Sequence, residues 1–433
     1  MDNKHQLKIN RICIQLNNRK GKGQVSLLKK SVSHQVPKPN GNKEKIDVSD
    51  LDDILLIDPS KKYCVCEPGV TFSDLVTETL KHNLVPKLVP ELKTITVGGA
   101  ISGCSVESMS YKYGGFHDSC TEYEVITSKG KVITCNNDRN KLIFEMMQGS
   151  FGTLGILSKI TFDLIDAKPF VKINYIEYNN YEDYKNAITA HFHKKDIDFM
   201  DGIIHSQNKY ILSIGNFENS APYIGKYDWM NIYYKSTGNR KEDHLKTYDY
   251  FFRYDAECHW ITRNYGLENP LLRFLFGKFF LGSTNMLTAA HKYNFLSKKK
   301  PDIVLDVFMP FSKFSGFMEF YYKKFNYFPI WIVPYKIKKY PWISDEYFSK
   351  VEDELFIDIA IYGFHQKGTL NYYRLIEKEL LRIGGIKTLI SYNYFSEDEF
   401  WSVWNKKNYQ SAKKQTDPDN IFQDIYKKTH NKQ

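Results

Sequence analysis

The chain has 433 residues and a net charge of +10, from 60 Lys and Arg against 50 Asp and Glu. Hydrophobic residues make up 42% and charged residues 25%, which excludes extensive disorder and predicts a globular protein of roughly two or three domains. The basic excess is scattered and never alternates with aromatic residues along one face, so we expect no nucleic-acid partner.

The N-terminal sequence MDNKHQLKIN lacks the apolar core of a signal peptide, and no run of about 20 apolar residues predicts a transmembrane helix. The seven cysteines include no CxxC pair, and their odd number indicates reduced thiols. We therefore expect an intracellular protein, either cytoplasmic or peripherally associated with a membrane. The isolated pair His191 and His193 has no neighbouring thiol or carboxylate cluster in the sequence, so we expect no metal site.

Short strands dominate the first 165 residues. GQVSLLKK, the end of IDVSDLDDILLIDP and KKYCVCEPGV are β-rich, and Cys64 and Cys66 alternate onto one strand face that suits buried packing. After Thr71, apolar residues recur at helical spacing and predict a capped helix that ends near Asn83. YEVITSKGKVITC predicts a hairpin around SKGK, and FGTLGILSKITFDLI predicts a further strand.

From Asp166 onward, longer strands alternate with helices. KPFVKINYIEY, PDIVLDVFMP, PIWIVPYK and LFIDIAIYG predict strands, and YEDYKNAITAHFH, SKFSGFMEFYYKKF and NYYRLIEKELLRIGG predict helices. The pattern predicts an α+β domain over residues 1–165, a second α+β domain with an antiparallel sheet over residues 166–385, and a C-terminal segment over residues 386–433 that returns to the first domain.

The segment from Asn269 to Leu287 is unusually apolar, since only Arg273 and Lys278 interrupt it. Two interpretations remain open, namely a buried helix or a helix that places its apolar face in a membrane surface. We favour peripheral membrane contact slightly.

The stretch TITVGGAISGCSVESMSYKYGG places five glycines between residues 94 and 115. The glycines suit either a pair of structural turns or a loop whose main-chain N–H groups surround phosphates. The sequence contains neither a GxGxxG turn with its helix and acidic residue nor a P-loop, so any phosphate must be held by a different architecture.

TVGGAISGCSVESMSYKYGGF, CTEYEVITSKGKVITC and SFGTLGIL together resemble the FAD-binding domain of the vanillyl-alcohol oxidase and p-cresol methylhydroxylase (PCMH) superfamily. Within it, the sequence is most similar to the Delta24-sterol reductase (24-dehydrocholesterol reductase, diminuto) family and its bacterial FAD-linked relatives. FMDGIIHS, NPLLRFLFG, FPIWIVPY, LFIDIAIYG and YFSEDEFW carry this match through the rest of the chain. The resemblance implies a two-subdomain PCMH-type FAD-binding domain followed by an α+β cap domain that builds the substrate pocket.

The resemblance also implies which residues bind FAD, and residues 96–108 would surround the pyrophosphate and approach the isoalloxazine. The residues implied for FAD binding are Thr96, Val97, Gly98, Gly99, Ala100, Ile101, Ser102, Gly103, Cys104, Ser105, Val106, Glu107, Ser108, Asp118, Gly152, Gly155 and Ile156. An earlier pyrophosphate loop is implied around Ser31 to His34, where this chain departs from the usual glycine-rich form. Neither His34 nor His117 lies in a recognisable attachment motif, so we expect FAD to be bound non-covalently.

In the resembling family, NADPH reduces FAD and the reduced flavin delivers hydride to a carbon–carbon double bond, while an acid protonates the other carbon. Tyr394 matches a tyrosine of the sterol reductases and is the first candidate for this acid, with Tyr392 as its neighbour. Lys112 is implied to stabilise the anionic reduced flavin, and Glu107 to orient Lys112. Each has a structural alternative, which is packing for the tyrosines, a surface position for Lys112 and bonding to loop amides for Glu107.

Three functions are compatible with these observations. The first is NADPH-dependent, FAD-linked reduction of a sterol or other lipid alkene, and the second is an FAD-linked oxidase or dehydrogenase of an alcohol or sugar. The third is a flavin-free protein that binds anionic membrane or nucleic acid. Phe328, Trp331, Phe356 and Tyr362 in the predicted cap strands suit a lipid-like ligand. The sequence does not indicate an oligomeric state.

Overall fold

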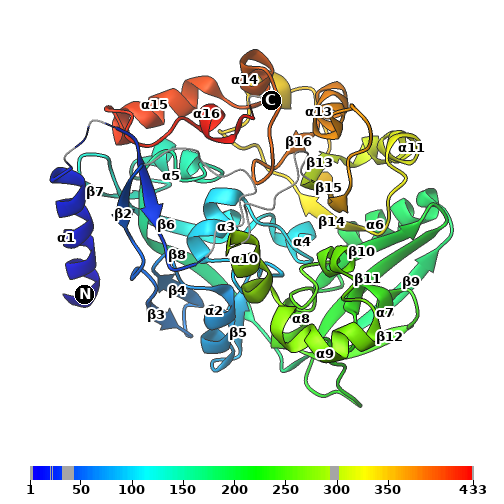
Figure 1. Cartoon of the computed structure of the whole chain (residues 1–433). Coiled ribbons are helices and arrows are strands. Elements are labelled where there is room, and N and C mark those ends of the chain that lie inside the picture. Colours follow the sequence, from blue (N-terminus) through cyan, green and yellow to red (C-terminus); the bar gives the residue numbers. More distant parts are fainter. Residues whose placement is uncertain (1–2, 20, 22, 32–42, 293–301, 432–433) are drawn as a thin grey trace.

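The computed structural model describes residues 3–19, 21, 23–31, 43–292 and 302–431 (Figure 1). Two antiparallel sheets and the helices around them form the α+β fold that the sequence predicted. The smaller sheet is built from residues 54–166, and the larger one from residues 170–387. The glycine-rich segment lies between the two sheets (Figure 1).

The smaller sheet has the strand order β3-β4-β8-β6-β7, and β5 also pairs with β8. Its strands are β3 (Ile54–Asp58), β4 (Tyr63–Cys66), β5 (Leu84–Pro86), β6 (Cys120–Ile126), β7 (Val132–Asn136) and β8 (Ile156–Asp166). The predicted hairpin is the pair β6 and β7, and Cys64 and Cys66 are fully buried as predicted. The predicted helix after Thr71 is α2 (Phe72–Leu80), and the Thr71 hydroxyl caps it by accepting from the Asp74 N–H.

The larger sheet has the strand order β12-β9-β11-β10-β14-β15-β13-β16, with antiparallel pairing throughout. Its strands are β9 (Phe170–Tyr178), β10 (Phe199–Ser206), β11 (Lys209–Glu218), β12 (Glu242–Lys246), β13 (Ile303–Pro310), β14 (Ile330–Lys336), β15 (Leu355–Phe364) and β16 (Ile386–Lys387). Because successive side chains alternate between the faces, each central strand contributes to two cores.

The two faces of the larger sheet pack against different layers. The outer face forms a core with α6 (Tyr181–Lys194), α11 (Phe314–Lys324) and α13 (Tyr372–Ile383). The inner face shares its core with the smaller sheet and with α3 (Val97–Gly103). The remaining elements are α4 (Ser110–Tyr113), η1 (Phe116–Ser119), α5 (Lys141–Met147), α7 (Tyr233–Thr237), α8 (Thr247–Phe251), η2 (Ile261–Tyr265), α9 (Pro270–Phe280), α10 (Ser283–Lys292), η4 (Phe311–Lys313) and α12 (Asp345–Phe348). No helix within the described ranges is long and apolar enough to cross a bilayer.

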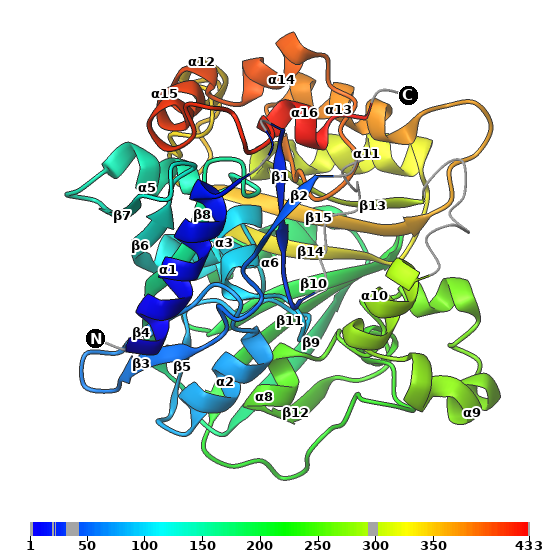
Figure 2. The same ribbon diagram turned by 60° about the vertical axis from the view of Figure 1, so that its left-hand side comes forward.

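Segments from near the two ends of the described chain lie side by side (Figure 2). The parallel strands β1 (Val25–Leu28) and β2 (Glu44–Asp47) lie next to the last helices. The Val25 N–H donates to the Ile421 carbonyl there at 2.9 Å. Lys413 likewise donates to the Thr153 carbonyl at 2.9 Å. The last helices are α14 (Glu397–Val403), α15 (Lys406–Thr416) and α16 (Ile425–Thr429).

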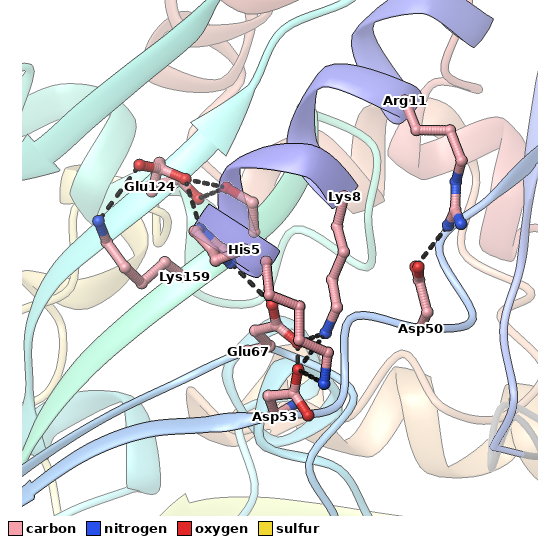
Figure 3. Close-up of polar contacts among 10 residues, drawn as sticks. His5, Lys8, Arg11, Asp50, Asp53, Glu67, Glu124 and Lys159 are labelled. Carbon is pink, nitrogen blue, oxygen red and sulfur yellow. Dashed lines mark hydrogen bonds and ion pairs between the residues drawn. The ribbon is translucent and has the colours of Figure 1, made fainter. Parts of the chain in front are cut away.

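The N-terminal helix α1 (Asn3–Asn17) was not predicted from the sequence, and buried charges hold it in place (Figure 3). His5 lies 2.7 Å from Glu67 and 3.2 Å from Glu124, and Lys8 lies 2.6 Å from Glu67 and 2.5 Å from Asp53. The hydrogen bonds with Glu124 and Glu67 raise the pKa of His5 to about 9, so the imidazole is cationic at neutral pH.

Candidate functional site

A cavity lies between the C-terminal end of α3 and the inner face of the larger sheet. It holds about 600 Å³ of empty space, part of which is open to solvent. Small residues of the glycine-rich segment and of the chain after α5 form one wall, among them Gly103, Cys104 and Gly149. The aromatic residues that line the cavity are Phe151, Phe308, Tyr335, Tyr340, Trp342 and Trp404. Such a space accepts a large, flat and mainly apolar group.

The first part of the glycine-rich segment is the short helix α3 and not the loop that we expected. Main-chain N–H groups at its start already have acceptors inside the protein. Val97 donates to the Val70 carbonyl, Gly98 to the Pro68 carbonyl and Gly99 to the Thr96 hydroxyl. A main-chain cradle for phosphates is therefore not formed by these N–H groups in this structure.

The glycines of this segment differ in what the absence of a side chain achieves. A Cβ at Gly98 would lie 2.6 Å from the Pro68 Cβ, so this glycine allows α3 to pack against the turn before α2. A Cβ at Gly103 meets nothing within 4 Å, which leaves the wall of the cavity open there. After α3, Cys104 and Val106 also line the cavity, and Ser102 and Ser105 are half-buried beside them.

Three other predicted residues, Glu107, Ser108 and Lys112, are not among the residues that line the cavity. Glu107 and Ser108 are buried, and Glu107 forms an ion pair with Arg253 at 2.8 Å. Burial raises the pKa of Glu107 to about 7, although Arg253 opposes that shift. Glu107 also accepts from the Ser108 N–H at 2.5 Å, which is the alternative of bonding to a loop amide. It does not orient Lys112, whose ammonium lies 3.8 Å from Asp198.

Asp118 connects the glycine-rich segment to the cavity. Its carboxylate accepts hydrogen bonds from the Gly115 N–H at 2.8 Å and from the Tyr340 hydroxyl at 2.7 Å. Tyr340 also bonds to Tyr335, and both tyrosines line the cavity. The neighbouring His117 is buried and neither ring nitrogen has a hydrogen-bond partner among the described residues, while burial lowers its pKa. His34, with most of the predicted early pyrophosphate loop, lies outside the described residues.

Gly152 lies beside a group of lysines that sequence reasoning missed. The four lysines of this cluster are Lys29, Lys43, Lys413 and Lys428. Lys428 donates to the Phe151 carbonyl at 2.5 Å, next to Gly152. Burial and the repulsion of the other three ammonium groups lower the pKa of Lys428 to about 8. Lys413 is paired with Asp417 at 2.8 Å, and the positive charge that remains beside Phe151 of the cavity wall fits a bound anion such as a diphosphate.

No local signal identifies this lysine cluster, because its members lie at opposite ends of the sequence. Gly155 and Ile156, the other two predicted residues near Gly152, contribute to the smaller sheet instead. Gly155 has a φ of +146° and packs against Val125 of β6, and Ile156 begins β8 in a buried position.

Tyr394 and Tyr392 pack against the outer core of the larger sheet, which includes residues of α13. The Tyr394 hydroxyl accepts a hydrogen bond from the Asn431 side chain at 3.0 Å, and its ring lies 5.8 Å from the ring of Tyr373. Among the described residues, the set that lines the cavity includes neither tyrosine. Their predicted role in proton transfer stays a prediction.

Two buried aspartates were missed on the inner face of the larger sheet. Asp358 of β15 pairs in register with Phe308, which lines the cavity, and paired residues of antiparallel strands point to the same face. Neither carboxyl oxygen of Asp358 has a hydrogen-bond partner among the residues that the structure describes. Burial, reinforced by Asp306 and Glu91, raises the pKa of Asp358 well above its usual range. The signal was available, since LFIDIAIYG places an acidic residue inside an apolar strand.

Comparison with known proteins agrees with this geometry. A family model described as an FAD binding domain matches residues 31–136, which include α3 and Asp118. The chain contains an FAD-binding domain. The Delta(24)-sterol reductase of Mus musculus is 25% identical over 399 residues, which cover 87% of this chain and 76% of that protein. The Delta(24)-sterol reductase homolog of Caenorhabditis elegans is 24% identical over 429 residues, covering 92% and 81%. These sterol reductases are homologues of the chain over most of its length.

A more distant relative matches only one part of the chain. Cytokinin dehydrogenase 9 of Oryza sativa is 27% identical over 146 residues, which cover 33% of this chain and 27% of that protein.

The residues on either side of the cavity fit FAD. The aromatic cavity suits the flat ring system, and the lysine cluster supplies the positive charge that a diphosphate needs. The Ser150 hydroxyl is buried without a hydrogen-bond partner among the described residues, and Ser150 lies next to Gly149, which lines the cavity. When bound, FAD supplies the capacity to accept and deliver hydride.

Proposed function

We propose that the protein is an FAD-dependent reductase that uses NADPH to saturate a carbon–carbon double bond in a sterol or a related lipid. The observation that carries this proposal is the aromatic cavity between the C-terminal end of α3 and the larger sheet, whose lining includes one charged residue, Lys387, among the residues that the structure describes. Burial lowers the pKa of that lysine, and it pairs with Glu377 at 2.5 Å. The similarity to Delta(24)-sterol reductases over most of the chain supports the same assignment.

An unactivated alkene requires a protein acid, because negative charge develops on one carbon as hydride reaches the other. Asp358 meets this requirement in two ways. Burial raises its pKa well above the usual range, which favours the protonated carboxyl group that a donor needs, and its position beside Phe308 is next to the cavity and shielded from water. We propose Asp358 as the proton donor, with Tyr394 and Tyr392 as the competing candidates and Lys112 as a residue that affects the flavin from the surface.

A lipid substrate is met at a membrane surface more often than in free solution. We therefore also propose that the protein works while peripherally attached to a membrane, through the segment from Asn269 to Leu287.

Anaerobic reduction of the FAD-loaded protein tests the reaction class. We expect NADPH to bleach the flavin absorbance, and mass spectrometry of sterols added afterwards to detect a gain of two hydrogens. The partial similarity to a cytokinin dehydrogenase supports an FAD-linked dehydrogenase or oxidase as the second candidate. Bleaching by an amine, an alcohol or a sugar, with NADPH inactive, would establish that second function. A preparation that binds no FAD would contradict both.

Two conservative variants distinguish the proposed proton donors. Asp358→Asn should leave reduction of the flavin by NADPH unchanged and slow alkene reduction at least about 100-fold, which is the usual contribution of a general acid. Tyr394→Phe serves as the matched comparison, since its hydroxyl contacts Asn431 and not the cavity wall. If Tyr394→Phe slows alkene reduction while Asp358→Asn does not, the roles are reversed.

A further inference from the structure

The helix α9 is inverted relative to an ordinary surface helix, because its apolar side chains face outward and its arginine faces inward. Arg273 is 1% exposed, and it donates to the Trp229 carbonyl and pairs with Glu257 inside the protein. Phe279, on the opposite side, is 72% exposed. The buried ion pair fixes the rotation of the helix about its axis, so the outward direction of the apolar side chains is built into the fold.

The exposed apolar side chains of this region form what we call the α9 patch. Its members are Tyr265, Leu271, Leu272, Phe274, Leu275, Phe276, Phe279 and Phe280. Surface apolar residues of soluble proteins usually occur singly, and a contiguous set on one element marks an interaction site.

The angular width of the α9 patch indicates what covers it. At about 100° per residue, the side chains from Phe274 round to Phe280 span about 240° of the helix circumference. Only Arg273 and Gly277 are buried in α9, and Gly277 lets the helix approach Trp229 closely. A helix docked on a protein partner typically presents an apolar stripe of about 100°, whereas lipid surrounds a partly inserted helix on several sides.

The charge of the residues around α9 favours a lipid surface over a second copy of the chain as the partner of the α9 patch. The sequence from Asn269 to Pro301 contains no acidic residue, while it includes Lys278, Lys292 and, outside the described residues, Lys298 to Lys300. Lys278 is exposed among the apolar side chains of the α9 patch, and its ammonium lies 4.8 Å from the ring of Trp229. Basic residues beside an exposed apolar helix are the combination that binds anionic bilayers.

We propose that the α9 patch is a docking surface for an anionic lipid membrane, into which α9 inserts parallel to the bilayer plane. With 11 residues, α9 is too short to cross a bilayer, which takes about 20. The next helix, α10, begins at Ser283, whose hydroxyl accepts from Thr94 at 3.0 Å just before α3. Docking through α9 therefore holds the FAD-binding segment close to the membrane.

Vesicle flotation with the full-length protein tests this proposal and needs no catalytic turnover, so its outcome is independent of the proposed reductase function. We expect binding to vesicles of phosphatidylcholine with phosphatidylserine, and at least about tenfold weaker binding of the double variant Phe274→Glu and Phe279→Glu. The matched control is Leu7→Glu with Ile14→Glu, which makes the same change of charge at two exposed apolar positions of α1. That control should bind as the wild type does.

Three results would overturn the proposal. The first is a wild-type protein that does not float with anionic vesicles, and the second is equal loss of binding in the α1 control. The third is self-association through the same surface, seen in sedimentation as a wild-type dimer that the α9 double variant converts to a monomer without any vesicle binding. Thermal melting of each variant verifies folding, and Phe274→Ala with Phe279→Ala repeats the test without added charge.

Discussion

At the scale of single residues, several ionisable groups lie in buried or partly buried positions. Lys428, Asp358, Glu107 and His5 all have pKa values displaced by burial or by close partners. Perturbed groups beside a cavity are candidates for binding and catalysis, whereas those surrounded only by protein are structural. By this criterion Lys428 and Asp358, which adjoin residues of the cavity wall, are candidates for the site, whereas His5 and Glu107 are structural.

Lys428 predicts a pH dependence for FAD binding. Its pKa of about 8 reflects burial and the repulsion of nearby lysines, and a bound diphosphate would raise that pKa, so the protonated lysine is the form that binds. FAD affinity should be constant below about pH 8 and fall as the pH rises above that value. Fluorescence titration of the flavin measures it.

The variant Lys428→Met should bind FAD about tenfold more weakly at pH 7 and lose the dependence near pH 8, since removing one charged contact costs about 1.4 kcal/mol. Lys427→Met, at the exposed neighbouring position, should behave as the wild type does. Equal affinities for the wild type and Lys428→Met would remove this cluster from the cofactor site.

His5 predicts a different pH dependence, that of stability. Its pKa is raised from 6.5 to about 9 in the folded state, so the stabilising contribution is fully present below pH 6.5 and is lost as the pH rises through about 9. Allowing for partial solvent screening, the loss amounts to about 2 kcal/mol.

Urea unfolding at pH 6 and pH 9.5 should show this loss in the wild type and a smaller one in His5→Gln. His82→Gln, on an exposed turn, provides the control. If the wild type and His5→Gln lose the same free energy of unfolding between pH 6 and pH 9.5, the contacts drawn in Figure 3 do not stabilise α1 electrostatically.

At the scale of elements, periodicity predicted most helices and strands where one face is buried. The α2 helix, the β6–β7 hairpin and the strands β13, β14 and β15 appear where the sequence placed them. The helix α3 was not predicted, because its glycines signal a turn and its stability comes from packing against Pro68, which is distant in the local sequence pattern. The site was predicted less well, since the lysine cluster and Asp358 become neighbours of the cavity only through long-range pairing.

The close contact of α3 with Pro68 predicts unequal effects for two glycines of the same helix. Gly98→Ala should destabilise the protein by about 1 to 3 kcal/mol, because its Cβ would overlap the Pro68 Cβ at 2.6 Å. The added methyl group of Gly103→Ala meets nothing within 4 Å, so the free energy of unfolding should change by less than about 0.5 kcal/mol. Chemical denaturation compares the two. Similar losses in both variants would show that the contact with Pro68 is not the cause.

At the scale of the whole molecule, Arg253 joins the segment after α3 to the larger sheet through buried ion pairs. Its guanidinium lies 2.8 Å from Glu107, just beyond α3, and 2.9 Å from Asp201 of β10 in the larger sheet. The rings of Tyr250 and Tyr254 lie against the same guanidinium. The chain that leaves the cavity wall at Val106 is therefore held to the larger sheet by a buried charge.

Removing this charge should cost much more than neutralising one of its partners. Arg253→Met leaves Glu107 and Asp201 buried without a cation and should lower the free energy of unfolding by about 3 to 5 kcal/mol. Glu107→Gln should cost less than about 1 kcal/mol, because a pKa of about 7 leaves about half of the Glu107 carboxyl groups uncharged at neutral pH. Urea denaturation at pH 7 measures both, and a larger effect for Glu107→Gln would contradict this account.

The closure of the C-terminal helices onto the first strands has a consequence for folding. Lys413 and Lys428 belong to the same cluster as Lys29 and Lys43, so the cluster is complete only after segments far apart in the sequence have met. Contacts between residues so distant in the sequence carry a large loop-closure cost and form slowly. A vitamin-derived coenzyme held by this cluster would therefore be taken up by a chain that has already folded.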